Sequence, residues 1–197
     1  KQSQVQAGPT LQLTVERDRH HLLVYPFIAP APQTLTLRQG EGGYQGTQDT
    51  YIETFDQAAV HGAEDRMNIT NDGNRTVLMR FDLSTVPTNM AIKSAQLKVY
   101  AHYKWGNAPS LAVSAHGLLC GWNPGEANWL QASNGVSWAK PGAWGADQDY
   151  QWAAASQGEM SDISRWYSFN VTDLVRQWLA DPSTNHGVLL RGQGGSV

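Results

Sequence analysis

Thr76-Val-Leu-Met-Arg-Phe-Asp-Leu-Ser84 and Trp166-Tyr-Ser-Phe-Asn-Val-Thr-Asp-Leu-Val-Arg-Gln-Trp-Leu179 are the two stretches that decide the fold. In the first stretch, Val77, Met79 and Phe81 fall on one side of an extended chain, and the residues between them fall on the other. Alternation of this kind, with a period of two, is typical of a half-buried β-strand.

The second stretch changes its period halfway. It alternates as far as Val171, and after Thr172 its apolar residues take helical spacing, which predicts a helix near residues 173–180 with Thr172 as the N-cap. Asp181-Pro182 ends the helix. The apolar stripe of this helix consists of Leu174, Val175, Trp178 and Leu179.

Outside these stretches, the chain shows short strand-like runs separated by turn signals. The runs cover residues 34–38, 49–54, 91–103, 111–118 and 186–191, whereas residues 119–165 have few periodic runs and are predicted to form aromatic-rich loops. Many short strands with a single short helix predict an all-β protein, a jelly-roll β-sandwich over residues 34–197.

The composition narrows the functional class. The chain has 197 residues and a formal charge of -3, and its lysines and arginines are scattered, which disfavours nucleic-acid binding. No apolar run approaches the length of a membrane-spanning helix.

Abundant Gly, Trp, Tyr and small polar residues suit an extracellular or cell-surface module, and we interpret Lys1 as the start of a mature form. The single cysteine, Cys120, is expected to be a small buried hydrophobic residue.

Residues 1–33 differ from the rest of the chain and are predicted to form an extended arm. Leu11, Leu13 and Val15 alternate with polar residues, as in a strand. An apolar run from Leu22 to Ile28 follows, and Ala29-Pro-Ala-Pro32 reads as a stiff spacer. The arm therefore has the character of a strand-forming segment attached to the sandwich.

A set of landmarks between about residues 48 and 192 resembles the DNRLRE-domain family in order and spacing. These landmarks are Asp49-Thr-Tyr-Ile52, Arg80-Phe-Asp-Leu-Ser84, Ile92-Lys-Ser-Ala-Gln-Leu97, Trp122, Ala127-Asn-Trp129, Trp138, Pro141-Gly-Ala143, Phe169-Asn-Val-Thr-Asp-Leu-Val175, Trp178-Leu179 and Asn185-His-Gly-Val-Leu-Leu190. The resemblance implies a secreted or surface-exposed β-sandwich, similar to carbohydrate-binding modules, without catalysis of its own.

The chain departs from that family at both ends. Members commonly have one more strand after the Gly-Val-Leu-Leu segment, whereas this chain continues only as Gly-Gln-Gly-Gly-Ser-Val197 after Arg191. At the other end, it carries the additional strand-like arm. The missing strand at one end and the additional strand at the other suggest that the arm takes the place of the missing strand.

The first functional hypothesis is self-assembly by donor-strand complementation, in which the arm of one copy completes the sandwich of the next. Residues 10–28 would span about 60 Å when extended, against a radius of gyration of about 15 Å for a 150-residue domain. Head-to-tail contact of this kind builds a pilus-like filament, a homopolymer. The inserted residues would be Leu11, Leu13, Val15, Leu22, Val24 and Phe27. In the alternative, the arm folds back and completes its own domain in cis.

The second hypothesis is polysaccharide binding through loop aromatics. Six of the eight tryptophans lie between Trp105 and Trp152. The candidates for stacking on a sugar are Trp105, Trp144 and Trp152, whereas the tryptophans at family landmarks are expected in the core or pinning loops. The latter are Trp122, Trp129, Trp138, Trp166 and Trp178.

Motifs for catalysis and metal binding are not found. The chain lacks a zinc pattern, a nucleophile elbow, a P-loop and Cys-His metal spacing, so neither an enzyme nor a cofactor is predicted. No spacing pairs two of the glutamates that glycoside hydrolysis would need, namely Glu41, Glu53, Glu64, Glu126 and Glu159. Asn68-Ile-Thr-Asn-Asp-Gly73 resembles a calcium loop only in part, and calcium held by loop carbonyls stays open as an alternative.

Overall fold

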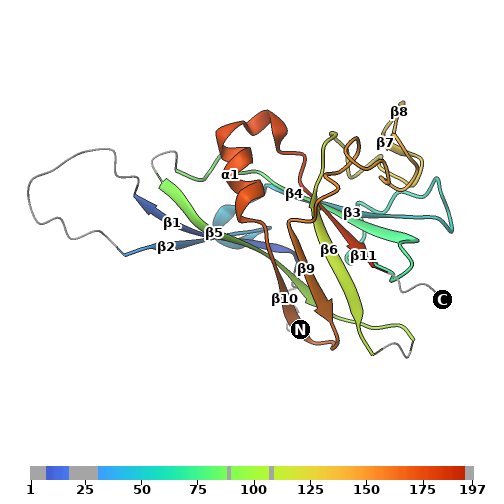
Figure 1. Cartoon of the computed structure of the whole chain (residues 1–197), viewed down its shortest axis with the longest axis horizontal. Helices are drawn as coiled ribbons and strands as arrows, with labels where there is room; N and C mark the ends of the chain where they lie inside the picture. Colours follow the sequence, from blue (N-terminus) through green and yellow to red (C-terminus); the bar gives the residue numbers. More distant parts are fainter. Residues whose placement is uncertain (1–7, 18–30, 88–89, 107–108, 194–197) are drawn as a thin grey trace, which may run out of the picture.

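The protein is a β-sandwich of two antiparallel sheets with one α-helix beside them (Figure 1). A computed structural model describes residues 8–17, 31–87, 90–106 and 109–193. The all-β sandwich with one short helix that the sequence predicts is therefore confirmed.

The first sheet has four strands in the order β10-β5-β1-β2, and all its ladders are antiparallel. Its strands are β1 (Thr10–Arg17), β2 (Gln33–Arg38), β5 (Met90–Ala101) and β10 (Arg165–Asn170). β1 and β5 lie in the middle of the sheet, and β2 and β10 form its edges.

The second sheet has five strands in the order β3-β4-β11-β6-β9, again antiparallel throughout. Its strands are β3 (Thr47–Glu53), β4 (Arg75–Phe81), β6 (Leu111–Gly117), β9 (Ser156–Met160) and β11 (Val188–Gly192). A small hairpin, β7 (Gln131–Ser133) with β8 (Val136–Ser137), stands in the loops between β6 and β9. Short 3-10 turns occupy Glu41–Gly43 and Pro182–Thr184.

The main core lies between the two sheets. β4 contributes Val77 and Met79 to it, β5 contributes Leu97, and β1 contributes Leu13, all of them almost completely buried. These residues face the core because successive side chains on a strand point to opposite faces of the sheet.

The helix α1 (Thr172–Ala180) closes one end of the sandwich beside β5. Its N-cap is Val171 rather than the predicted Thr172, and the Asn170 side chain accepts a hydrogen bond from the Thr172 N–H at 3.0 Å. The Thr172 hydroxyl instead accepts from the Ala95 N–H at 3.0 Å, which ties the helix to β5. Leu174, Val175 and Trp178 are buried as the stripe predicts, and Asp181 is the C-cap.

β4 differs from the prediction of a half-buried strand, because both of its faces are covered. Val77 and Met79 face the other sheet, whereas Leu78 on the opposite face is fully buried in a second apolar cluster. Ile52 and Leu189 lie in the same second cluster, beneath loop residues between 118 and 150. The predicted aromatic loops therefore form a cover over the outer face of the five-stranded sheet.

The N-terminal arm is part of the sandwich in this structure. β1 pairs with β2 on one side and with β5 on the other, all within one chain, which corresponds to the cis alternative. The gap expected beside the last strand is not found there, because β11 lies between β4 and β6 among the described residues. The strand that enters from the arm completes the opposite sheet.

Candidate functional site

The first group of predicted site residues lies on β1. Leu11, Leu13 and Val15 are 1%, 0% and 1% exposed and pack in the core between the sheets. The other predicted insertion residues, Leu22, Val24 and Phe27, lie outside the described residues. Half of the predicted set is thus brought together on one strand, in the role of core residues.

β1 has a neighbouring strand on each side in its sheet. It is a central strand, with Gln12 opposite Gln96 on β5 and opposite Thr36 on β2. Near its end, the Glu16 carboxylate pairs with the Lys93 ammonium at 2.7 Å. Removing β1 would leave β5 without one of its two neighbours and would open the core beneath Leu97.

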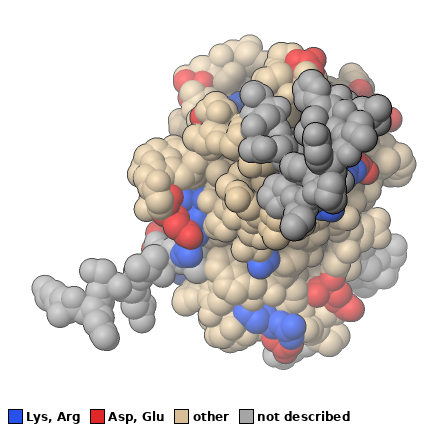
Figure 2. Space-filling view, turned by 90° about the vertical axis from the view of Figure 1, so that its left-hand side faces the viewer, with Lys and Arg blue, Asp and Glu red and all other residues tan. Residues whose placement is uncertain are grey.

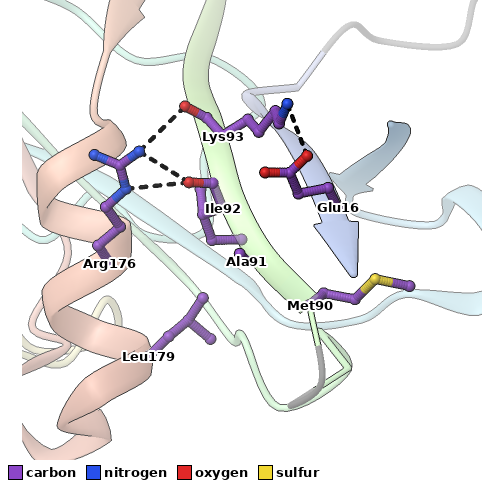
Figure 3. A pocket seen from close by; sticks show the side chains of 7 residues that line it. All are labelled: Glu16, Met90, Ala91, Ile92, Lys93, Arg176 and Leu179. Carbon is purple, nitrogen blue, oxygen red and sulfur yellow. Dashed lines mark hydrogen bonds and ion pairs between the residues drawn. The ribbon is translucent and has the colours of Figure 1, made fainter. Parts of the chain in front are cut away.

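A groove lies at the end of β1, between β5 and α1 (Figure 3). It has a volume of about 620 Å³, with an apolar floor that includes Ile92 and Leu179. The guanidinium of Arg176 reaches across and donates from Nε and Nη2 to the Ile92 carbonyl, at 3.1 and 3.0 Å. Because Met90 and Ala91 in its lining pair with Arg17 and Glu16, the groove marks the point where β1 ends.

Two of the three tryptophans predicted to stack on sugars are exposed, but they lie far apart. Trp105 is 87% exposed and precedes β6, whereas Trp152 is 67% exposed and lies beside the end of β6, where the Gln151 N–H donates to the Gly117 carbonyl. β6 lies between them in the chain, and its seven residues span about 20 Å. They cannot form one stacking platform together.

The third, Trp144, is engaged in packing. The Arg191 guanidinium carbon lies 3.8 Å from its ring centroid, and Trp129 meets the ring edge-on at 6.2 Å. A Cβ at Gly73 would come within 2.7 Å of the same ring. The faces of Trp144 are therefore occupied by the protein itself.

The remaining tryptophans follow the prediction with one exception. Trp122, Trp129, Trp138 and Trp178 are 4%, 8%, 4% and 4% exposed and pack in the two cores. Trp166, predicted to be in the core or to pin a loop, is 39% exposed and belongs to β10 on the outer side of the four-stranded sheet.

A buried carboxylate organises the cover on the five-stranded sheet. Asp149 is 2% exposed and accepts hydrogen bonds from the backbone N–H groups of Ala139, Lys140 and Gly145 at 2.7, 3.1 and 2.8 Å. Three such bonds compensate the cost of burying the carboxylate and hold three points of the loop together.

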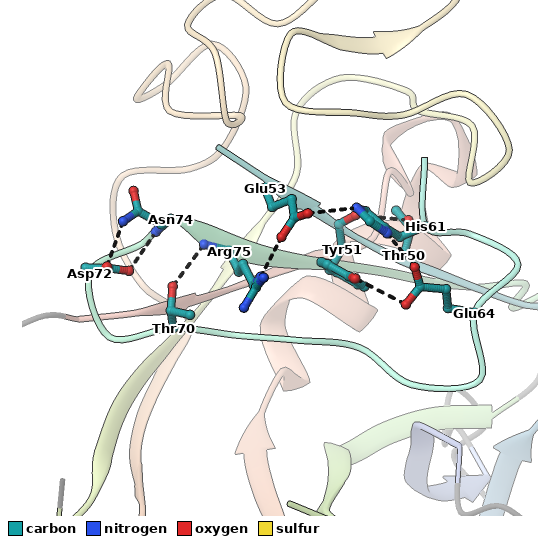
Figure 4. Close-up of polar contacts among 9 residues, drawn as sticks. All are labelled: Thr50, Tyr51, Glu53, His61, Glu64, Thr70, Asp72, Asn74 and Arg75. Carbon is teal, nitrogen blue, oxygen red and sulfur yellow. Dashed lines mark hydrogen bonds and ion pairs between the residues drawn. The ribbon is translucent and has the colours of Figure 1, made fainter. Parts of the chain in front are cut away.

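A polar cluster that no sequence motif indicated links β3, β4 and the loop between these two strands (Figure 4). The His61 imidazole lies between the Glu53 carboxylate, 3.6 Å from Nε2, and the Glu64 carboxylate, 2.5 Å from Nδ1. Its ring stacks on Tyr51, with centroids 4.0 Å apart. Arg75 donates from Nε to Glu53 at 2.6 Å.

This cluster commits its carboxylates to the protein rather than to a substrate. Glu53 and Glu64 share one imidazole, and Tyr51 also donates to Glu64 at 3.1 Å. Among the described residues, no group of three or more His, Cys, Asp or Glu side chains is arranged to hold a metal ion. No spacing in the sequence could have revealed the cluster, because the loop between Glu53 and His61 decides it.

The outer face of the four-stranded sheet carries polar and aromatic side chains that remain partly exposed, among them Gln96, Lys98 and Tyr100. Across the sheet, Ser168, Lys98, Thr10 and Arg38 form one row, and Gln96, Gln12 and Thr36 belong to the next. Trp166 and Tyr100 face each other at the end of this pattern. Alternation within each strand indicated which residues share this face. It could not predict which residues of neighbouring strands lie opposite each other.

Charge is spread thinly over the molecule. Where described residues are visible in Figure 2, Lys, Arg, Asp and Glu occur in small groups of both signs rather than in one continuous basic surface. In the described part of the chain, no helix is long and apolar enough to span a membrane.

The architecture defines a β-sandwich domain completed by N-terminal strands. Residues 51–196, most of the chain, match the family model described as the disaggregatase related repeat domain. The chain belongs to this family. The resemblance to DNRLRE domains that the sequence landmarks suggested is therefore wrong: the family that the match shows is the disaggregatase related repeat domain. No curated protein matches the chain.

Proposed function

We propose that this chain is a non-enzymatic, extracellular structural module whose copies join head to tail by exchanging strand β1. The observation that carries the proposal is the boundary of the family match. Residues 51–196 contain β5 and β10 of the four-stranded sheet, whereas β1 and β2 precede the matched segment. In this chain, strands that precede the matched segment therefore contribute to the same sheet as β5 and β10.

The connection between β1 and β2 supports exchange. These strands are antiparallel neighbours, for which a hairpin needs only about 2–5 residues. Residues 18–32 join them instead. A connection of this length permits β1 to occupy the same slot in another copy while β2 stays in its own sheet.

Burial of apolar side chains favours a strand in the position between β2 and β5, whether β1 comes from the same chain or from another copy. Leu11, Leu13 and Val15 are almost fully buried, and each contributes about 1.5–3 kcal/mol of transfer free energy when buried. The slot between β2 and β5 also satisfies backbone groups on both neighbours, which would otherwise be unpaired. Because a copy that receives a strand also donates one, the contact continues from copy to copy unless it closes a ring.

The description of the family as a repeat domain related to disaggregatase supports a modular role. A module of this kind would act at the cell surface or outside the cell through its contacts with copies of itself.

Cysteine pairing between two differently tagged chains tests the exchange. Gln12 and Gln96 are opposite each other, away from the register shift at Thr14/Val15. In a Cys120→Ala background, one chain carries Q12C and the other Q96C. The two are unfolded in urea, refolded together and oxidised. We expect covalent heterodimers on a non-reducing gel, and size-exclusion chromatography of the unmodified chain should show assemblies that grow with concentration.

The matched control uses Ser168 and Lys98, which are opposite each other within the family-matched segment. Chains carrying S168C and K98C should give only background heterodimer, since β5 and β10 stay in one copy. The proposal is wrong if the Gln12 and Gln96 pair gives no more heterodimer than this control.

A second candidate function is polysaccharide binding, favoured by exposed aromatic rings. Trp105, Trp152 and Trp166 are 87%, 67% and 39% exposed. Aromatic rings present apolar faces that suit the C–H faces of sugars. Retention on an insoluble or gel-immobilised glycan tests it, and a chain that is retained by none would remove this candidate.

A further inference from the structure

The four-stranded sheet presents an ordered outer face whose chemistry points to a ligand. On β5 the outward residues are Gln96, Lys98 and Tyr100, since the alternate residues Ala95 and Leu97 are fully buried and Val99 packs against the core. The register brings Trp166 opposite Tyr100 and Gln12 opposite Gln96. Residues from β1, β5 and β10 thus meet on one surface.

The aromatic end of this face can hold a sugar ring. Trp166 and Tyr100 make an edge contact, with ring centroids 5.4 Å apart and planes at 63°. In such a pair one ring fixes the other, which lowers the conformational entropy lost when a ligand stacks on the exposed indole.

The middle of the face offers hydrogen-bonding groups that no described residue engages. Within the described parts of the chain, the side-chain amides of Gln12 and Gln96 have no hydrogen-bond partner. Each amide can both donate and accept, as ring hydroxyls do.

The charge of the face selects among glycans. Glu16 is the only acidic residue in the four strands, and its carboxylate is paired with Lys93. On the outer side of the sheet, Lys98 and Arg38 belong to one row across the strands, and Arg38 pairs with Glu41 at 3.8 Å. Arg165 lies on the other side of β10, with Tyr167. Lys98 has no ion pair with any residue that the structure describes. Lys98 therefore gives this face a positive charge that no described carboxylate pairs, in a chain with a formal charge of -3, and a carboxylate is its complement.

We propose that the outer face of the four-stranded sheet binds a polysaccharide that carries carboxylate groups, with Trp166 and Tyr100 stacking on a sugar ring, Gln12 and Gln96 bonding its hydroxyls and Lys98 pairing with a carboxylate. This inference rests on the second candidate function, polysaccharide binding. It places the binding site on the sheet face instead of at the loop tryptophans. Because Gln12 belongs to β1, the face is complete whichever copy supplies that strand.

Affinity electrophoresis of the full-length chain tests the site. Native gels contain sodium alginate or polygalacturonate as carboxylated glycans, or hydroxyethyl cellulose as a neutral one, and a gel without glycan gives the reference mobility. We expect retardation by the carboxylated glycans that weakens as salt is raised. W166A should weaken binding about tenfold or more, and K98Q about threefold to tenfold, with a smaller salt dependence.

Matched controls separate this site from the general function. W105A and W152A remove more exposed tryptophans elsewhere, and K140Q removes one charge from the covered side of the sandwich; all three should bind as the wild type does. Thermal unfolding checks that W166A and K98Q are folded. Retardation by no glycan would overturn both the second candidate function and the site. Binding lost in W105A or W152A but kept in W166A would overturn the site alone, and retardation by hydroxyethyl cellulose only would overturn the carboxylate preference.

Discussion

The two sheets of the sandwich treat their outer faces in opposite ways. On the five-stranded sheet, Leu78, Ile52 and Leu189 point outward and are completely buried by the loops around β7 and β8. On the four-stranded sheet, Gln96, Lys98 and Tyr100 point outward in the corresponding way and remain partly exposed. One outer face has become a second core, and the other is available for binding.

The difference lies in what the loops contribute. Between β6 and β9 the chain supplies Trp122, Trp129 and Trp138 to the second core, and Asp149 holds the loop backbone over it. Gly142 takes a positive φ of 84°, and a Cβ there would overlap the Trp129 ring. A cover of this density behaves as interior packing rather than as surface loop.

The largest effect expected from this contrast is at Leu78. Leu78→Ala should lower the free energy of unfolding by about 2–5 kcal/mol, because the cavity lies within a closed second core. Urea denaturation followed by tryptophan fluorescence measures the change. Gln96→Ala, at an outward position on the central strand of the other sheet, should change stability by less than about 0.5 kcal/mol. Equal effects at the two positions would contradict the distinction between covered and open faces.

The next largest effect is expected at Asp149. Asp149→Asn removes one of the carboxylate oxygens that receive the three backbone N–H groups, and should cost about 2–3 kcal/mol of unfolding free energy. The near-ultraviolet circular dichroism of the covering tryptophans should weaken as well. Asp173→Asn is the control, since the Asp173 side chain is 94% exposed. If Asp149→Asn leaves both signals at their wild-type level, the loops are held by other contacts.

The covered face should also make stability depend on pH. His116 lies on the outer side of β6, where burial lowers its pKa below the ordinary value of 6.5, and the nearby Arg191 charge acts in the same direction. Its Nδ1 lies 2.9 Å from the Gln151 carbonyl and its Nε2 lies 2.8 Å from the Ser114 hydroxyl, so the neutral ring with a proton on Nδ1 fits this site.

Because the folded-state pKa of His116 is the lower one, its contribution is present above pH 6.5 and is lost as pH falls further. Urea midpoints measured from pH 7.5 to 4.5 should fall less steeply in His116→Gln than in the wild type. His186, whose pKa is also lowered, should retain part of the slope. His102→Gln, at an exposed position, serves as the control and should keep the wild-type slope; an identical slope in His116→Gln would refute the prediction.

The smallest expected effect is on the reactivity of the Cys120 thiol. Burial against the second core raises the pKa of the Cys120 thiol from 9.0 to about 11, and the Asp149 carboxylate acts in the same direction. The rate of alkylation by iodoacetamide should therefore rise through about pH 11 in the native protein and near pH 9 in the urea-unfolded chain. Native Cys120 that reacts at pH 8 as fast as unfolded Cys120 would show that the cover opens readily.

Several elements were predictable because their signals are local. The spacing of Leu174, Val175 and Trp178 located α1, and the alternation in residues 91–103 located β5. The candidate site was only partly predictable. Alternation indicated which residues of β5 and β10 share a face, but Trp166 resembled its buried counterparts, and only the register brought it next to Tyr100 on the open side.

By itself, the sequence determined the fold class, the helix and the strand character of the N-terminal arm, because periodicity and capping act over a few neighbouring residues. Only the tertiary structure decided that β1 lies between β2 and β5, that Leu78 is covered and Gln96 is not, and that His61 bridges two carboxylates. These outcomes depend on contacts between segments far apart in the chain, and a strand carries the same alternation whether its outer face meets solvent or a second core.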